Sequence, residues 1–229
     1  MPSSRYERAA RKAGFRVIAG LDEAGRGALF GPVFAAAVVL DPERPIRGLD
    51  DSKALEPERR EVLAERIRER AVAWAVGAAD AFEIDHINIY QASLLSMRRA
   101  LSQLETRLPE RFDYLLLDAV KLADIPVAQK SLIHGDALCF SIAAASILAK
   151  VHRDAALRAW DNVFPEYGLA QNKGYSTPDH IAALEREGPT TLHRFSFEPV
   201  RSASRYYPAW TGYPTARPFP DQRELFACL

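Results

Sequence analysis

Apolar residues along this chain form continuous runs, alternating patterns and helical repeats. Residues 15–21 and 33–40 are almost wholly apolar, which is typical of strands that are covered on both faces. Residues 71–78 place apolar side chains at period two and predict a third strand. Short apolar segments predict two more strands, at residues 114–117 and within residues 125–133.

Helical repeats occur between these predicted strands. Residues 56–70 combine a short apolar stripe with a face rich in Arg and Glu, and residues 91–108 repeat Leu and Met at steps of three and four. Residues 140–160 form a strongly helical stretch that is rich in Ala. Strands that alternate with helices in this way predict an α/β domain.

A short helix is predicted to begin at Pro178, with Thr177 as its cap and Gly188 just past its end. His180 lies in its first turn, and His193 follows it. Isolated histidines of this kind are more often structural than catalytic.

Other segments lack a period. Residues 1–14 are expected to be a polar lead-in, and residues 168–175 a loop. From residue 201 onward, four prolines and several aromatic residues occur with no helical or strand period. We therefore expect one domain at residues 1–200, with a helical C-terminal region, and a Pro- and aromatic-rich tail at residues 201–229.

Charge and cysteine content narrow the possible functions. The 229 residues contain 30 Lys and Arg against 30 Asp and Glu, so nucleic acid would have to be bound through a local patch. Cys139 and Cys228 lie far apart in sequence, which favours a reducing, cytoplasmic setting. The absence of a signal-peptide pattern and of an apolar run of roughly twenty residues argues against a membrane protein.

The first apolar run ends in two adjacent carboxylates, Asp22 and Glu23, followed by Gly25-Arg26-Gly27. Successive side chains of a strand point to opposite faces, so both acids face one way only if the chain bends there, which the glycines allow. Two carboxylates beside a bare backbone suit a hard metal ion that faces a phosphate. The alternative is a strand that ends in solvated acids and a tight turn.

Two further acids are placed similarly. Asp118 ends the strand at residues 114–117, at the sheet edge where α/β proteins collect ligands. Asp136 lies just before the Ala-rich helix, so the alternative for it is an N-terminal cap or first-turn acid.

One face of the Ala-rich helix carries polar side chains. Ser146, Lys150 and Arg153 are spaced by four and three residues, which brings a hydroxyl and two cations together. The alternative is a surface ion-pair row, because Asp154 is placed to pair with Lys150.

Several motifs occur in an order that is similar to that of one protein family. They are Gly20-Leu21-Asp22-Glu23-Ala24-Gly25-Arg26-Gly27, Asp51-Ser52-Lys53, Leu117-Asp118, Gly135-Asp136, the Ala143 to Val151 stretch with Arg153-Asp154, and Lys173-Gly174-Tyr175. From about residue 17 to residue 200, the chain resembles bacterial ribonuclease HII, the type 2 ribonuclease H family. Ala28, Ala119 and His134 depart from the family's usual proline, glycine and lysine.

The resemblance implies a ribonuclease H-like fold with a mixed central sheet flanked by helices. It also implies an endonuclease that hydrolyses RNA in RNA–DNA hybrids and cuts 5′ of ribonucleotides embedded in duplex DNA, leaving 3′-OH and 5′-phosphate ends. Such an enzyme would be a cytoplasmic monomer that removes ribonucleotides and primers. The rival hypotheses are another two-metal nuclease or phosphatase, and a non-catalytic module that binds hybrids.

By position, Asp22, Glu23, Asp118 and Asp136 match the family's four catalytic, metal-binding carboxylates, which would hold two Mg²⁺ or Mn²⁺ ions. Such a pair activates a water on one side of phosphorus and stabilises the leaving oxygen on the other. Oxygen ligands suit these ions, and the lack of a His/Cys cluster argues against zinc.

The resemblance also assigns substrate contacts. The motif at residues 25–27 would read the ribose 2′-OH through its backbone, and Tyr175 would pack on the sugar beside the junction. Cations would contact phosphates without reading sequence. The full set of substrate-binding candidates is Gly25, Arg26, Gly27, Lys53, Ser146, Lys150, Arg153 and Tyr175.

The tail contains one motif. Gln222, Leu225 and Phe226 match the spacing of the Gln-x-x-Leu-Phe peptides by which bacterial replication proteins dock on the sliding clamp. The alternative is that Leu225 and Phe226 pack on the protein's own surface.

Overall fold

The structure is a computed structural model that describes residues 2–204. The chain divides into two compact units, which are described one after the other. Within the described residues, the first unit comprises residues 2–24, Val33–Ala78 and Ser93–Val151. The second comprises Gly25–Pro32, Ala79–Ala92 and the chain from residue 152 onward, of which residues up to 204 are described.

A mixed sheet forms the centre of the first unit. Within residues 2–204 its five strands are β1 (Ile18–Ala24), β2 (Val33–Val39), β3 (Ala73–Ala79), β4 (Tyr114–Asp118) and β5 (Ala128–Leu132), in the order β3-β2-β1-β4-β5. Strand β1 pairs with β2 in antiparallel fashion and with β4 in parallel, and β4 pairs in parallel with β5. The mixed sheet confirms the predicted fold class.

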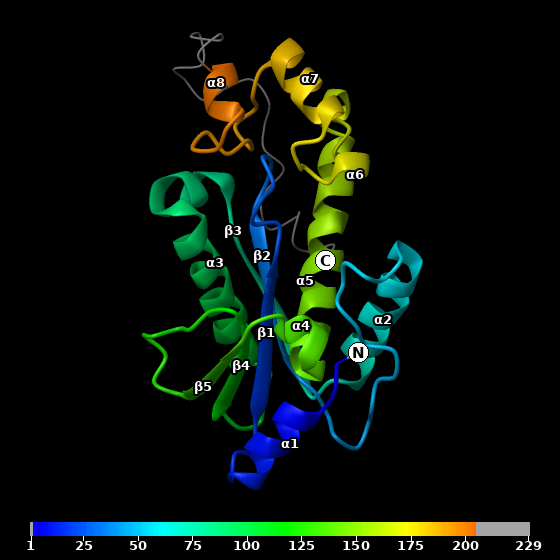
Figure 1. Ribbon diagram of the computed structural model, residues 1–229, viewed down its shortest axis with the longest axis vertical. Coiled ribbons are helices and arrows are strands. Elements are labelled where there is room, and N and C mark those ends of the chain that lie inside the picture. Colours follow the sequence, from blue (N-terminus) through cyan, green and yellow to red (C-terminus); the bar gives the residue numbers. More distant parts are fainter. Residues whose placement is uncertain (1, 205–229) are drawn as a thin grey trace. The chain divides into compact units, whose positions relative to one another are not determined.

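Helices cover both faces of this sheet (Figure 1). Strand alternation divides the core, because Ala35 and Ala37 of β2 pack in one cluster while Ala36 and Val38 pack in the other. The first cluster includes Met97, Leu101 and Leu104 of α3 (Ala81–Glu105). The second brings together α2 (Pro57–Arg70) and the Ala-rich part of α5 (Phe140–Asp161), through residues such as Leu63, Ile67, Ala144 and Leu148.

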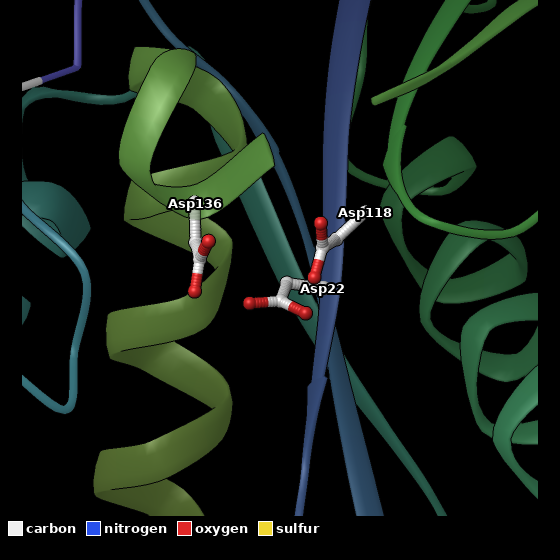
Figure 2. Close-up of side chains that lie close together, drawn as sticks. All are labelled: Asp22, Asp118 and Asp136. Carbon is white, nitrogen blue, oxygen red and sulfur yellow. The ribbon is translucent and has the colours of Figure 1, made fainter. Parts of the chain in front are cut away.

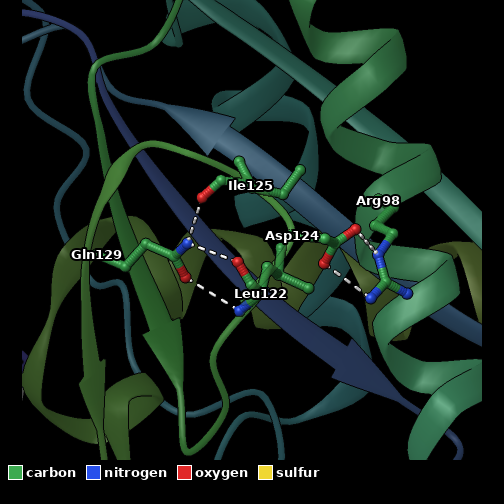
Figure 3. Close-up of polar contacts among 5 residues, drawn as sticks. All are labelled: Arg98, Leu122, Asp124, Ile125 and Gln129. Carbon is green, nitrogen blue, oxygen red and sulfur yellow. Dashed lines mark hydrogen bonds and ion pairs between the residues drawn. The ribbon is translucent and has the colours of Figure 1, made fainter.

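Side-chain hydrogen bonds and an ion pair hold the loop that connects β4 and β5 (Figure 3). The amide group of Gln129 donates to the carbonyl oxygens of Leu122 and Ile125 and accepts from the backbone N–H of Leu122. Arg98 of α3 forms a two-pronged ion pair with Asp124, with N–O distances of 2.6 and 2.9 Å. These bonds fix the loop that follows Asp118.

The expected polar lead-in at residues 1–14 is wrong, because Arg5–Lys12 form helix α1. Its buried side chains are Ala10 and the charged Glu7, and only Tyr6 packs beside Ala10 in the apolar cluster, so the apolar stripe of this helix is short. Helix α4 (Gly135–Leu138) lies just before α5 and contains Asp136 in its first turn.

The second unit contains η1 (Pro165–Tyr167), α6 (Leu169–Asn172), α7 (Pro178–Glu187) and α8 (Val200–Ser204). The hydroxyl of Thr177 accepts from the backbone N–H of His180 at 3.3 Å, which confirms the predicted cap. Helix α6 lies in the segment expected to be a loop, and α8 includes the first four residues assigned to the tail. The remainder of that tail, with Gln222, Leu225 and Phe226, lies outside the described residues.

No helix within residues 2–204 combines the length and apolar character that crossing a membrane requires.

Candidate active site

Three carboxylates from distant parts of the sequence converge in the first unit (Figure 2). Asp22 lies on β1, Asp118 ends β4, and Asp136 lies in the first turn of α4. One oxygen atom of each lies within 4.8 Å of the others, and this is the group of acids within the described residues that could hold a metal ion. Parallel pairing of Leu21 with Leu117 places the first two acids side by side.

Backbone bonds fix these carboxylates. Asp118 accepts from the N–H of Gly135 at 2.7 Å, and this bond ties the end of β4 to the start of α4. Asp22 accepts from the N–H of Glu23 at 2.7 Å, and Asp136 from that of Ala137 at 2.9 Å. The three acids are therefore oriented by bonds that leave other carboxylate lone pairs available to a cation.

Two residues that depart from the family pattern lie at strained turns beside this cluster. Ala119, directly after Asp118, has φ 51°, and His134, two residues before Asp136, has φ 56°. Both values lie in the left-handed region that glycine adopts without steric cost, which explains why glycine is usual at residue 119.

Burial and like charge dominate the electrostatics. Burial, with smaller effects from the charges of Glu23 and Asp118, raises the pKa of Asp22 well above its usual value. Burial and then the charges of Asp51 and Asp118 raise the pKa of Asp136. A divalent cation would relieve this repulsion, and the oxygen-only donor set fits Mg²⁺ or Mn²⁺.

Lys53 responds to the same negative field. Burial lowers the pKa of Lys53, but the nearby charges of Asp51, Asp136, Asp22 and Asp118 outweigh it, so that the pKa is raised overall. Its side chain is exposed. A lysine with these neighbours can meet a phosphate that approaches the acids.

Glu23 lies beside Asp22 but outside the converging group. Strand β1 continues to Ala24, paired residue by residue with β2, so the bend that the glycines allowed does not occur between the two acids. The charge of Glu23 still acts on Asp22. Its metal-binding role stays a prediction.

A buried hydrogen-bonded group next to Asp22, formed by Ser146, Ser52 and Arg60, was not predicted from the sequence. Ser146 hydrogen-bonds the carboxylate of Asp22, and its hydroxyl lies 2.8 Å from that of Ser52. Arg60 donates to the carbonyl oxygens of Ser52 and Leu55, both at 2.8 Å. Ser146 is only 4% exposed, which fits a residue that orients Asp22 better than one that touches substrate.

The other substrate-binding candidates differ in exposure. In the second unit, Arg26 and Gly27 are exposed, whereas Gly25 is buried with φ 93°. Tyr175 is 37% exposed. Lys150, on α5 in the first unit, is half-buried.

Arg153 is fully buried in the second unit and donates to the carbonyl of Lys173 at 2.8 Å. Its guanidinium lies 5.2 Å from the ring centre of Tyr175, in cation–π contact. A Cβ at Gly25 would lie 2.0 Å from its Nε atom. This burial does not fit the expected phosphate contact, and Arg153 instead supports the two neighbouring loops.

Comparison with known proteins identifies the family. The family model described as ribonuclease HII matches residues 19–200. The chain belongs to the ribonuclease HII family. It is 64% identical over 200 residues to ribonuclease HII of Solibacter usitatus, covering 87% of this chain and 86% of that one. It is 57% identical over 202 residues to ribonuclease HII of Koribacter versatilis, covering 88% and 78%.

These relatives make the chain a ribonuclease H enzyme and confirm the resemblance drawn from its motifs. Solved structures agree on the fold. The ribonuclease H2 of Pyrococcus horikoshii OT3 is 24% identical with a TM-score of 0.70, covering 84% of this chain and 99% of that one. The RNase HII in a PCNA complex from Archaeoglobus fulgidus is 25% identical with a TM-score of 0.65, covering 80% and 96%.

Proposed function

We propose that this enzyme hydrolyses RNA in RNA–DNA hybrids and cuts 5′ of ribonucleotides embedded in duplex DNA, leaving 3′-OH and 5′-phosphate ends. The observation that carries the proposal is the convergence of Asp22, Asp118 and Asp136, whose oxygen atoms lie within 4.8 Å of one another. Membership of the ribonuclease HII family supports the substrate class. We propose a monomer that acts in the cytoplasm, in the removal of ribonucleotides and primers.

In this proposal Asp22, Asp118 and Asp136 hold two Mg²⁺ or Mn²⁺ ions, with Glu23 as the fourth carboxylate. Two bound divalent ions supply an activated water and stabilise the leaving oxygen. Lys53, exposed and subject to the field of the acids, contacts the phosphate that must approach this negative site. The carboxylates remain ionised because the cations offset the repulsion that otherwise raises their pKa values.

Substrate selection in this proposal depends on the backbone at residues 25–27 and on Tyr175. A glycine-flanked turn lets backbone groups approach the 2′-OH, which is the group that separates RNA from DNA. Tyr175, which is partly exposed, packs on the adjacent sugar in this proposal. Lys150 contacts phosphate, whereas the buried Arg153 and Ser146 hold their neighbours in place.

Cleavage of three duplexes tests the proposal: all-DNA, RNA–DNA hybrid, and DNA with one ribonucleotide. With Mg²⁺, the enzyme is expected to cut the last two, and EDTA or Asp136→Asn is expected to abolish cutting. Asp179→Asn is the matched control, because that exposed acid lies on α7 and is not part of the cluster. Cleavage of all-DNA duplex would favour another two-metal nuclease, and hybrid binding without cleavage would favour a non-catalytic module.

We also propose that Gln222, Leu225 and Phe226 dock on a sliding clamp. The motif supports this, and the archaeal RNase HII solved in complex with PCNA is a structural relative. Deletion of residues 222–229 is expected to abolish clamp binding in a pull-down while cleavage of the single-ribonucleotide duplex is retained. Unaltered clamp binding would refute the assignment.

A further inference from the structure

Arg194 is a fully buried arginine of the second unit whose guanidinium binds the loop that follows β1. Its Nη2 atom donates to the carbonyl of Gly25 and its Nη1 atom to that of Arg26, each at 2.8 Å. Its Nε atom donates to the carbonyl of Gly31 at 2.9 Å. The planar fork of arginine suits two successive carbonyls in a way that a lysine ammonium does not.

These bonds determine where the amides of the turn point. In a trans peptide the C=O and the following N–H point in opposite directions, and both peptide bonds here are trans. Because the carbonyls of Gly25 and Arg26 are directed inward at Arg194, the N–H groups of Arg26 and Gly27 are directed to the opposite side. Both residues are exposed, and the space beside the Gly27 α-carbon is open. The turn thus presents two amides outward.

The position of Arg194 is energetically demanding. Burial, with a smaller effect from the charge of Arg153, lowers the pKa of Arg194 to about 9. The group is still a cation at neutral pH, although its hydrogen bonds go to neutral carbonyls. The three hydrogen bonds to carbonyl oxygens offset part of the cost of removing this cation from water.

His193, the preceding residue, starts a directional chain of hydrogen bonds. The backbone N–H of Thr190 donates to Nδ1 of His193 at 2.9 Å, which places the imidazole proton on Nε2. Nε2 lies 3.2 Å from Nε2 of His180, which must therefore accept, and His180 Nδ1 donates to the carbonyl of Tyr175 at 2.9 Å. One backbone donor thus determines both tautomers and holds the backbone of Tyr175.

We infer that Arg194 and His193 are positioning residues that hold the two substrate-reading elements, the turn at residues 25–27 and Tyr175, in a single arrangement. The segments next to the two elements are also joined, since the N–H of Leu29 donates to the carbonyl of Gly174 at 2.7 Å. Two consecutive residues of the segment after α7 therefore govern how the enzyme recognises the ribonucleotide. This inference rests on the proposed function.

The test uses Arg194→Lys in the full-length enzyme, which keeps the charge but loses the fork. The control is Arg186→Lys, an exposed arginine of α7 in the same unit. We measure kcat and KM on the single-ribonucleotide duplex, together with the inhibition constant of an all-DNA competitor, which offers no 2′-OH. For Arg194→Lys we expect at least a tenfold fall in kcat/KM with the inhibition constant within twofold of wild type. The control is expected to leave both unchanged.

The outcomes separate the inference from the proposed function. A wild-type enzyme that does not cut this duplex refutes the proposed function. A wild-type enzyme that cuts, combined with an unchanged kcat/KM for Arg194→Lys, overturns the inference. Equal losses in kcat/KM and in competitor binding also overturn it, because they indicate a general structural role.

A double-mutant cycle tests the histidine chain. His193→Asn and His180→Asn are each expected to lower kcat/KM on the single-ribonucleotide duplex about tenfold, and the double variant no further, because either change breaks the same chain. The all-DNA inhibition constant should again stay within twofold of wild type. Losses that multiply in the double variant, or no loss in either single variant, would contradict a shared path to Tyr175.

Discussion

Replacing Asp22 by asparagine is expected to stabilise the metal-free protein while abolishing its activity. Asp22 is 5% exposed, and one of its oxygen atoms lies within 4.8 Å of an oxygen of Asp118 and of Asp136. Asparagine keeps the shape and an acceptor for the N–H of Glu23, so the substitution removes mainly charge. Without a cation, that charge repels its neighbours.

The size of the effect follows from the geometry. Two unit charges 4.8 Å apart repel by about 3.5 kcal/mol at an effective dielectric constant of about 20. Lys53 and partial protonation offset part of this, so we expect a gain of about 1–3 kcal/mol in the free energy of unfolding. For a chain of this size, each kcal/mol raises Tm by about 2–4 °C.

Thermal unfolding in EDTA, followed by circular dichroism, measures this gain against wild type and against Asp179→Asn, which changes an exposed acid of α7. Adding Mg²⁺ should then raise the Tm of wild type and of the control, but change that of Asp22→Asn much less, because binding to the folded state adds stability. A lower Tm for Asp22→Asn in EDTA, or an equal Mg²⁺ response in all three proteins, would refute the reasoning.

Three further predictions concern the scaffold. Burial lowers the pKa of His193 to about 3, so between about pH 6.5 and pH 3 the unfolded state binds more protons than the folded state. The free energy of unfolding therefore falls as the pH falls through that window, by up to about 1.4 kcal/mol per pH unit. His193→Asn should show a shallower fall when urea unfolding is measured across this pH range. Glu7→Ala should lower the free energy of unfolding by about 1–3 kcal/mol, because the buried N–H of Ser141 loses its acceptor at 2.7 Å, while Glu7→Gln should cost less. Gly25→Ala should reduce cleavage of the single-ribonucleotide duplex at least tenfold, because its Cβ would meet a buried guanidinium; Gly14→Ala, with φ +100° but open space around it, is the matched control.

Each of these three has a contrary result. An unchanged pH slope in His193→Asn would mean that this histidine is not a buried neutral group. Equal destabilisation by Glu7→Ala and Glu7→Gln would show that acceptance from Ser141 is not what Glu7 contributes. Full activity in Gly25→Ala would show that the turn has room for a side chain.

Local patterns predicted much of the fold. The apolar runs, the helical repeats and the Thr177 cap depend on nearby residues, and they located the main strands and helices. The first strand was misplaced because its pairing with β2 continues through Asp22 and Glu23, opposite Ala36 and Ala35, where the apolar signal has already ended. Helix α1 was missed because a charged residue, Glu7, forms part of its buried face.

The site was only partly predictable for a related reason. The carboxylates at two strand ends suggested that Asp22 and Asp118 meet. Asp136 is brought beside them by the hydrogen bond from the N–H of Gly135 to Asp118, two residues that are 17 positions apart with β5 between them. Arg194 left no local signal, because its acceptors are backbone carbonyls 163 to 169 residues earlier in the chain. Every residue has a backbone carbonyl, so the sequence does not show which carbonyls accept a hydrogen bond from Arg194.

Anomalous diffraction from crystals of the protein grown with Mn²⁺ tests the central claim most directly. We expect anomalous density within coordination distance of oxygen atoms from Asp22, Asp118 and Asp136 together, and we expect this density to be lost in Asp22→Asn. Density that avoids these three carboxylates, or that persists unchanged in the variant, would contradict it.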